Sequence, residues 1–433
     1  MNDLSNRTGI NPPPPRNVEM RPRPTRTGPF GVLDIGSSKI ACMIGRAESD
    51  GRLRALGFGW QKSRGIKSGG IVDLDEAERA IRAAVGAAED MADTRLKSVV
   101  VNLSCGQPES RLFNVQWPID GRPVMEDDIR RVVREARARA NAEGRCTIHV
   151  LPLGFATDET DGVADPRGLF CETLTARLHV VDASRTAIKS VAACLARCEL
   201  EITAMVSAPF ASGLATLVED ERTLGSIVID MGGGTTTLAV FAEGQVLHTA
   251  QLPVGGQHVT NDVARLLSTH VAHAERLKTL YGTCQPSPDD AREMLPVPMV
   301  GEAEHQIAKV PRSALVSVIR PRLEEIFELV RDRIDTSGLG RAAGNRVVLT
   351  GGAAQLVGAR ELAAEILKRQ VRIGRPFGVI GLPDSATGPN FSTLTGLLAF
   401  ATGDGQTLHD LDLSHEPRRG PFGKIKAFLQ ERL

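Results

Sequence analysis

A short apolar run, a glycine-rich turn and a second apolar run follow one another between residues 226 and 241. The apolar runs are Ser226–Ile229 and Leu238–Phe241. This pattern predicts two buried strands joined as a β-hairpin. The turn residues with candidate chemistry are Asp230, Gly232, Gly233, Gly234, Thr235 and Thr236. Glycines let backbone N–H groups crowd an anion, and the carboxylate suits a magnesium-bound water. The alternative is an ordinary glycine hairpin with an aspartate at its corner.

The same pattern occurs near the start of the chain, where apolar runs at 30–33 and 40–44 flank a second turn. The turn residues with candidate chemistry are Asp34, Gly36, Ser37, Ser38 and Lys39. Asp34 precedes Asp230 by 196 positions (230 minus 34), and each copy is followed by a further hairpin signal. A repeat of this length predicts two similar α/β halves whose glycine turns face each other across a cleft. Lys39 supplies a positive charge for a phosphate.

Apolar positions at helical or strand spacing predict the elements around these two turns. Asp73 and Glu76 have the spacing of a capping box before a helix. Residues 97–181 mix strand-like runs with one helix and predict a small inserted α+β subdomain; the arginines of that helix indicate a solvated face more than a nucleic-acid site. The remaining predictions are helices over 184–198 and 313–334, a strand over 202–206, and irregular chain over 285–311.

A third glycine turn follows an apolar strand at Arg346–Leu349 and consists of Thr350, Gly351, Gly352 and Ala353. Unpaired N–H groups at a helix start and small side chains leave room for a flat ring or a phosphate, although an ordinary βα turn has the same pattern. Glu275 and Lys278 lie three positions apart, on one face of a predicted helix. A solvated ion pair is the equal alternative for them.

Composition narrows the classes of protein. The 433 residues carry 52 basic and 52 acidic side chains, so no overall field attracts nucleic acid or a membrane. The seven cysteines include no CxxC pair, and no signal segment is evident, which predicts reduced thiols of a cytosolic protein. No apolar run reaches the roughly 18 residues of a transmembrane helix. We expect a protein that is soluble or rests on a membrane surface.

The two ends of the chain differ from its middle. Residues 1–29 are rich in proline and arginine and predict a disordered arm that either contacts a partner or is inert. At the other end, a polar linker over 403–420 precedes an amphipathic segment at 421–433. The apolar stripe of that segment consists of Phe422, Ile425, Phe428, Leu429 and Leu433. This stripe predicts a short helix on a membrane surface, against the alternative of a helix docked on its own domain.

The three glycine sites, in this order, resemble those of the actin-like ATPase superfamily. Within it, the chain is similar to the FtsA family of bacterial cell-division proteins from about Phe30 to Thr402 and again at the C-terminus. The more specific resemblances are Ser63–Asp73, Val228–Thr235, Val348–Ala354 and Gln370–Pro376. The resemblance implies an α/β fold of the duplicated actin-like ATPase type, with two halves around a nucleotide cleft and an inserted α+β subdomain of the FtsA type (1C, SHS2-like).

The resemblance also implies ATP and Mg²⁺ as ligands. It places the phosphates on Gly36, Ser37, Ser38, Lys39, Gly232, Gly233, Gly234, Thr235 and Thr236. Hydrated magnesium would lie at Asp34 and Asp230. The adenosine would lie beside Gly351, Gly352 and Ala353, with Glu275 and Lys278 near its ribose and base. No residue is marked as a hydrolytic base, and the implied ATPase activity is weak at most.

The resemblance divides the chain into actin-like subdomains. In the first half, subdomain 1A consists of 30–97, 182–206 and the closing helix 385–402, and subdomain 1C is the insert 98–181. In the second half, subdomain 2A consists of 207–239 and 312–384, and subdomain 2B is 240–311. Outside these subdomains lie the N-terminal arm 1–29, the linker 403–420 and the membrane helix 421–433.

The implied function is a cell-division protein that polymerises on the cytoplasmic face of the inner membrane at the septum. The implied partners are further copies of itself, the C-terminal peptide of FtsZ and later division proteins, with no nucleic acid. The alternatives are a pilus or secretion assembly ATPase of the same fold and a small-molecule kinase of the superfamily. A heat-shock chaperone is disfavoured, because only about 30 residues follow the ATPase core and leave no room for a peptide-binding domain.

Overall fold

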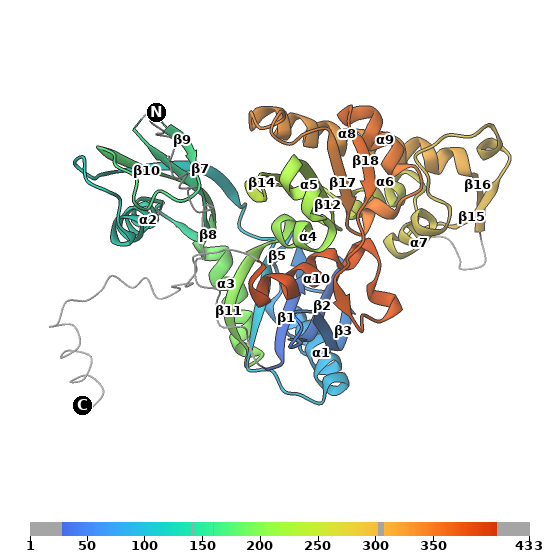
Figure 1. The fold of residues 1–433 in the computed structure, drawn as a ribbon. Helices are drawn as coiled ribbons and strands as arrows, with labels where there is room; N and C mark the ends of the chain where they lie inside the picture. Colours follow the sequence, from blue (N-terminus) through green and yellow to red (C-terminus); the bar gives the residue numbers. More distant parts are fainter. Residues whose placement is uncertain (1–27, 141, 159, 302–306, 405–433) are drawn as a thin grey trace, which may run out of the picture.

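Two sheets of matching topology form the body of the protein (Figure 1). The computed structural model describes residues 28–140, 142–158, 160–301 and 307–404. The strand order is β11-β6-β1-β2-β3-β19 in the first sheet and β14-β13-β12-β17-β18 in the second. In each sheet three consecutive strands form an antiparallel meander, β1-β2-β3 in the first and β12-β13-β14 in the second. Parallel strands then extend the sheet from the first strand of the meander: β6 and β11 beside β1, and β17 and β18 beside β12. The predicted duplication into two α/β halves is therefore confirmed.

The structure has a strand at each apolar run or strand predicted above, namely at 30–33, 40–44, 202–206, 226–229, 238–241 and 346–349. The first sheet contains β1 (Phe30–Ile35), β2 (Lys39–Ala47), β3 (Leu53–Lys62), β6 (Ser98–Leu103), β11 (Glu201–Ser207) and β19 (Val379–Ile380). The second contains β12 (Ser226–Met231), β13 (Thr236–Ala242), β14 (Gln245–Leu252), β17 (Arg346–Thr350) and β18 (Gln370–Ile373).

The α-helices cover both faces of both sheets. In chain order they are α1 (Leu74–Ala92), α2 (Glu126–Ala140), α3 (Arg185–Arg197), α4 (Ala208–Thr216), α5 (Glu219–Leu224), α6 (Gly256–Leu266), α7 (Val271–Tyr281), α8 (Arg312–Thr336), α9 (Ala359–Leu367) and α10 (Ser392–Ala399). Asp73 is the N-cap of α1 and accepts a hydrogen bond from the Glu76 N–H at 3.0 Å, which is one of the two hydrogen bonds of the predicted capping box.

The layers follow from the way in which successive residues of a strand point to opposite faces. Val32 packs into a central layer with α4 and α10, whereas Leu33 packs outward against α1 and α3. In the second sheet, Val228 points to the same central layer and Ile229 points outward to α6, α8 and α9. Because both faces are covered, these strands are apolar throughout, which explains their continuous apolar runs in the sequence.

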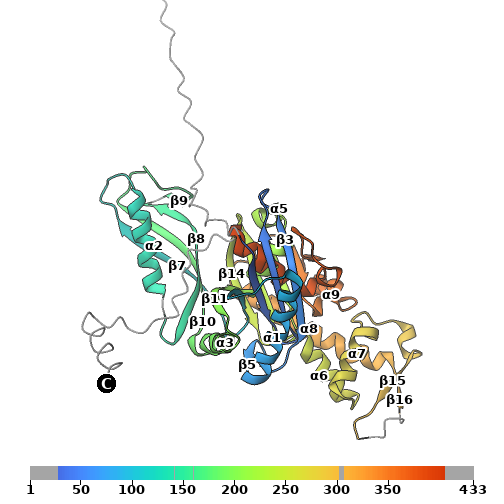
Figure 2. The same cartoon turned by 90° about the horizontal axis from the view of Figure 1, so that it is seen from below.

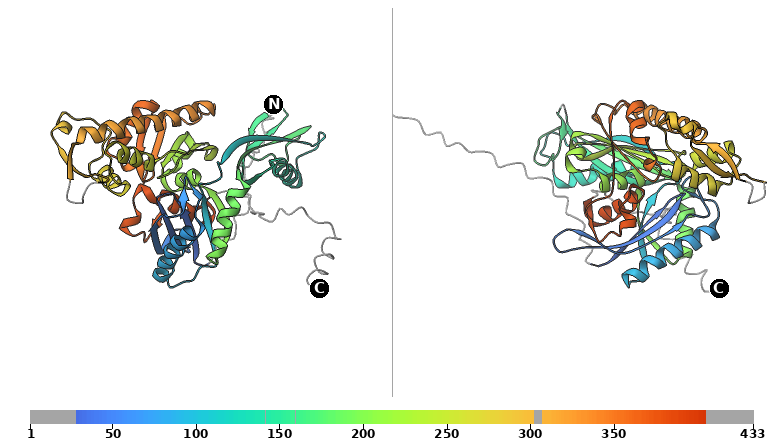
Figure 3. Two further views of the ribbon diagram at one scale, coloured as in Figure 1. Left: turned by 180° about the vertical axis from the view of Figure 1, so that it is seen from behind. Right: turned by 90° about the vertical axis from the view of Figure 1, so that its right-hand side faces the viewer.

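The predicted insert is a separate α+β unit with its own core. Its sheet has the order β7-β10-β8-β9, from β7 (Glu109–Pro118), β8 (Arg145–Thr157), β9 (Thr160–Val163) and β10 (Thr173–Ser184). Helix α2 packs on this sheet through Val132 and Ala136. The views in Figures 2 and 3 place the insert at one end of the molecule and the small β15–β16 sheet at the other.

The segment 285–311 is a correction, because irregular chain was predicted and the structure contains a ribbon of two strands. A 3-10 turn (Pro288–Ala291) precedes β15 (Met294–Pro298), which pairs antiparallel with β16 (Ile307–Pro311). Pro296 and Pro298 are two positions apart, so their missing N–H groups lie on the same edge of the strand. A two-stranded ribbon has a free outer edge on each strand, and proline is tolerated there.

One further prediction has a partial outcome, and the predictions for the two ends of the chain lie outside the described residues. After the third glycine turn, only a 3-10 turn (Ala353–Gln355) follows, and α9 starts at Ala359. The predicted membrane residues Phe422, Ile425, Phe428, Leu429 and Leu433, and the arm up to residue 27, lie outside the described residues. Among the helices that the structure describes, none is long and apolar enough to cross a bilayer.

Candidate functional site

The two predicted glycine turns touch each other between the two halves. Each turn is closed in the same way, by Gly36 N–H donating to Lys39 O at 3.0 Å and by Gly232 N–H donating to Thr235 O at 2.9 Å. A Cβ atom added at Gly233 would lie 2.8 Å from the Ser38 Cβ. Only glycine allows this approach of the two backbones. The structure thus brings together two turns that are almost 200 positions apart.

Three charged groups lie at this contact. Asp34 and Asp230, each the last residue but one of its strand, are largely buried carboxylates with 8% and 9% of their surface exposed. Burial raises the pKa of Asp34 to about 6. The Lys39 ammonium lowers this pKa in part, and the negative charge of Asp230 raises it further. Burial likewise lowers the pKa of Lys39, against the attraction of both carboxylates. The ammonium bonds to the Asn390 carbonyl oxygen.

Asp230 is held by hydroxyl groups. Burial raises its pKa, while hydrogen bonds from Ser212 and Thr393 and the Lys39 charge act in the opposite direction. The Thr393 hydroxyl donates to Asp230 Oδ2 at 2.8 Å, and the Ser212 hydroxyl bonds to the same oxygen. Two carboxylates beside backbone N–H groups and one ammonium suit a divalent cation together with an anionic group.

The third glycine turn packs directly on the second. Gly351 has φ +89°, and a Cβ there would lie 2.4 Å from Asp230 Oδ1. Its neighbour Gly352 has an ordinary helical φ of −64° and is exposed. Thr350 at the end of β17 bonds to Ser392 Oγ at 2.7 Å. The third turn is therefore fixed against both the second turn and the start of α10.

Glu275 and Lys278 reach the same place from α7. Lys278 Nζ lies 2.7 Å from Glu275 Oε2 and donates to the Gly256 carbonyl oxygen at 3.1 Å. Gly256 in turn donates to Gly232 O at 2.9 Å, and a Cβ there would lie 3.0 Å from the Ala353 Cβ. The pair thus lies beside Gly256, which contacts both turns, with the Lys278 side chain largely buried and the Glu275 side chain half exposed.

One predicted site residue differs in orientation. The Thr236 hydroxyl donates to the Val254 carbonyl oxygen at 2.8 Å, and the residue is 1% exposed. Its hydroxyl is therefore bonded to the neighbouring segment and not directed to the turn. Strand pairing explains this difference, because Thr236 is already the first residue of β13.

Sequence reasoning missed several residues that support the first turn. Asn102 Oδ1 accepts the Ile35 N–H at 2.7 Å, and the Asn102 amide donates to Ser104 Oγ. The Gly69 N–H donates to Ser37 Oγ at 2.9 Å. Gly69 belongs to the small hairpin of β4 (Ile66–Lys67) and β5 (Gly70–Ile71), inside the stretch Ser63–Asp73 that was singled out only for its resemblance. No local pattern marks Asn102.

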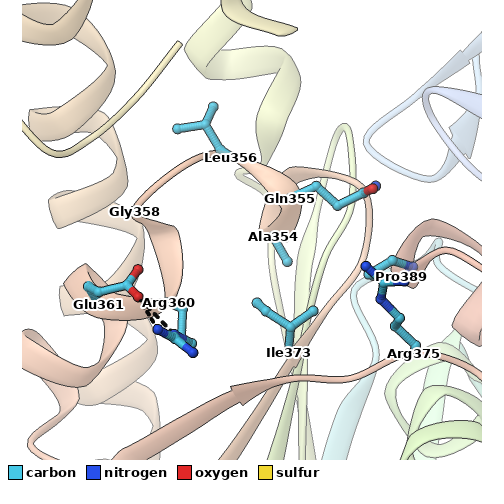
Figure 4. A pocket seen from close by; sticks show the side chains of 9 residues that line it. All are labelled: Ala354, Gln355, Leu356, Gly358, Arg360, Glu361, Ile373, Arg375 and Pro389. Atoms are coloured by element: carbon cyan, nitrogen blue, oxygen red, sulfur yellow. Dashed lines mark hydrogen bonds and ion pairs between the residues drawn. The ribbon is translucent and has the colours of Figure 1, made fainter.

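A cavity of about 380 Å³ begins next to the third turn (Figure 4). Its lining residues are Ala354, Gln355, Leu356, Gly358, Arg360, Glu361, Ile373, Arg375 and Pro389. In Figure 4, Arg360 and Glu361 pair on one side of the cavity, and Arg375 lies on the other. The lining includes no residue of the two facing turns, so this cavity lies beside the third turn and not where the first two turns meet.

Comparisons with known proteins agree with this architecture. Residues 227–396 match the family described as "Cell division protein FtsA", and residues 105–182 match the "SHS2 domain inserted in FTSA". A cell division protein FtsA from Rhizobium meliloti (strain 1021) is 45% identical over 393 residues, covering 88% of this chain and 89% of the relative. The corresponding protein of Escherichia coli (strain K12) is 33% identical over 375 residues, covering 85% and 89%.

Solved structures show the fold at much lower identity. The type IV pilus biogenesis complex PilM-PilN matches with a TM-score of 0.61 at 18% identity, over 86% of this chain and 98% of that one. MreB 5 of Spiroplasma citri, solved bound to AMPPNP, matches with a TM-score of 0.50 at 13% identity, over 94% and 100%. These likenesses support the fold alone, whereas the sequence relatives cover most of the chain at high identity. The chain therefore belongs to the FtsA family of actin-like cell division proteins.

Proposed function

We propose that the chain binds ATP and Mg²⁺ in the cleft where its two glycine turns meet. The observation that carries this proposal is the contact of the turns at Gly233 and Ser38, with Lys39, Asp34 and Asp230 around it. Apart from the Gly36 and Gly232 N–H groups, which close their turns, backbone N–H groups of the glycine turns could donate to phosphate oxygens, and the ammonium adds a point charge. Magnesium, when bound, would neutralise phosphate charge and would be held through water by the two carboxylates.

The proposed binding residues divide by the part of the nucleotide that they would hold. The phosphates would contact Gly36, Ser37, Ser38, Lys39, Gly232, Gly233, Gly234 and Thr235, and the backbone of Thr236. The adenosine would lie beside Gly351, Gly352 and Ala353, where the Glu275–Lys278 pair approaches through Gly256. The cavity beyond Ala354 leaves additional room on that side.

Replacing Lys39 tests the phosphate site. Lys39→Met keeps the length of the side chain and removes its charge, so we expect at least a tenfold loss of affinity for a fluorescent ATP analogue with Mg²⁺ present. Lys62→Met is the matched control, because Lys62 pairs with Lys39 across β2 and β3 but is exposed. Equal affinities of the parent and Lys39→Met would exclude this phosphate site.

We further propose that the protein polymerises and connects FtsZ to the inner face of the cytoplasmic membrane at the septum, where it recruits later division proteins. Family membership supports this proposal and argues against the pilus-assembly and kinase alternatives. The segment 240–311 is proposed to dock the C-terminal peptide of FtsZ, and the helix 421–433 to rest on lipid. One short helix would bind weakly, so several copies on a polymer would be needed for firm attachment.

Co-sedimentation tests this adaptor function. FtsZ and lipid vesicles are centrifuged with the full chain or with a chain ending at Gly420, each with and without ATP. We expect vesicles to recruit FtsZ only through the full chain, and more strongly with ATP. If the full chain carries no FtsZ to the vesicles, the adaptor function is wrong, while nucleotide binding stands or falls with the Lys39 experiment.

A further inference from the structure

Two buried helices, α4 and α10, cross between the two sheets. Every residue of both helices is buried. Helix α4 packs on β12 and β13 of the second sheet, and α10 packs on β1 and β2 of the first. A Cβ added at Gly396 of α10 would lie 1.7 Å from the Ala211 carbonyl oxygen of α4. Glycine therefore allows the two backbones to touch, and this contact joins one half of the protein to the other.

Each of these helices contributes one hydroxyl group to Asp230. Ser212 of α4 and Thr393 of α10 lie 2.9 Å apart, oxygen to oxygen, and both contact Asp230 Oδ2. The two hydroxyl groups have two protons between them, whereas there are three short contacts: one from each hydroxyl to Asp230 and one between the hydroxyls. Both donate to the carboxylate, because a hydrogen bond to a charged acceptor is the stronger one. Ser212 is fully buried and Thr393 is 8% exposed, so water does not compete freely for these bonds.

The carboxylate is consequently held through one of its oxygens and closely packed at the other. Oδ2 is held by the two hydroxyls, and Oδ1 lies against the Gly351 backbone, where a Cβ would come within 2.4 Å. Asp230 cannot change its orientation without losing a bond to one of the two helices. A small relative movement of α4 and α10 would likewise turn the carboxylate.

We propose that Ser212 and Thr393 form one positioning pair, which orients Asp230 for a divalent cation bound with a nucleoside triphosphate and links that cation to the contact between α4 and α10. This inference rests on the proposed nucleotide binding and adds the residues that couple it to the relative position of the two halves. Neither hydroxyl touches the nucleotide in this scheme. Each hydroxyl acts through Asp230, so removing it should weaken binding of the cation more than binding of the nucleotide alone.

The test compares nucleotide affinity with and without the cation. A fluorescent ATP analogue is titrated against the full chain in excess Mg²⁺ and again in EDTA, and the ratio of the two dissociation constants gives the Mg²⁺-dependent gain. For Thr393→Val, which keeps the shape and removes the hydroxyl, we expect this gain to fall about tenfold while the affinity in EDTA changes less than twofold. Ser212→Ala should act in the same direction and provides a second variant if Thr393→Val does not fold.

Two controls separate positioning from packing. Thr393→Ser keeps a hydroxyl and should restore the parent gain. Thr395→Val removes a buried hydroxyl from the same helix that donates only to the Phe391 carbonyl oxygen, and it should leave the gain unchanged. The double variant of Ser212 and Thr393 should lose less than the product of the two single losses, as expected for groups that act as one unit.

Two results would overturn the inference. One is an unchanged Mg²⁺-dependent gain in both Thr393→Val and Ser212→Ala. The other is an equal loss of affinity with and without Mg²⁺, which would show a packing role only. A parent chain that binds no nucleotide in either condition would instead refute the proposed function itself.

Discussion

His179 provides the sharpest test of the contact between the insert and the second sheet. Its ring, on β10, is fully buried, and its Nε2 lies 2.6 Å from the Ser110 hydroxyl oxygen. The same oxygen accepts the Thr249 N–H of β14 at 3.1 Å. Burial lowers the pKa of His179 from 6.5 to about 3, and the nearby His248 adds to the shift. We therefore expect the stability of the protein to depend on pH through this residue.

The sign follows from the two states of the chain. Below pH 6.5 the unfolded chain binds a proton at His179 that the folded chain takes up only near pH 3, so the free energy of unfolding falls as the pH falls through this window. From pH 7.5 to pH 5 the expected loss is about 2 kcal/mol, at roughly 1.36 kcal/mol per pH unit. Asp34 acts in the opposite direction, because its raised pKa of about 6 favours proton uptake by the folded chain. That gain is about 1.4 kcal/mol over the same interval and hides most of the loss in the parent.

A variant isolates the histidine contribution. Urea unfolding of the parent and of His179→Gln is measured at pH 7.5 and pH 5, and the change in unfolding free energy between the two pH values is compared. On going from pH 7.5 to pH 5, the unfolding free energy of the parent should fall by about 2 kcal/mol relative to that of His179→Gln. The contribution of Asp34 cancels in this comparison, because both proteins contain it. His273→Gln, at an exposed position of α7, should behave like the parent. If His179→Gln and the parent change by the same amount, the buried neutral histidine is refuted.

Two further substitutions test contacts that hold the second half together. Gly351→Ala should lower the unfolding free energy by at least about 2 kcal/mol, because φ is +89° and the new Cβ would meet Asp230 Oδ1. Gly352→Ala, at an ordinary helical φ, should lower it by less than about 0.5 kcal/mol. Equal shifts of the melting temperature in the two variants would contradict this reasoning. Arg372→Met should lower the unfolding free energy, measured with urea, by about 2 kcal/mol, because it removes the bidentate partner of the buried Glu221 carboxylate. This value is reduced to allow for solvent screening, since 37% of the Arg372 side chain is exposed. Adding Glu221→Gln to that variant should restore part of the loss, and no recovery would show that the cost is not electrostatic.

Much of the fold was predictable because its signals are local. The turns at Asp34–Lys39 and Asp230–Thr236 lie between apolar runs that become β1, β2, β12 and β13. Their repetition predicted two halves, and the matching sheet orders confirm it. The ribbon of β15 and β16 was missed, because prolines in a window of sequence indicate irregular chain unless their common edge is known. The assignment of phosphate, adenosine and magnesium contacts to individual residues stays a prediction.

Outside 285–311 and the start of the helix after the third turn, the sequence by itself determined most of the strands, turns and helices named above, and which residue types stand at the turns. It did so because hydrophobic period, capping and glycine turns act over a few neighbouring positions. Only the tertiary structure decided that Ser212 and Thr393, 181 positions apart, meet on one oxygen of Asp230. The hydroxyls of Ser and Thr are common in helices, and nothing local states which partner they reach. Such a partner is defined only when packing of α4 against α10 brings the two halves together and excludes water from the carboxylate.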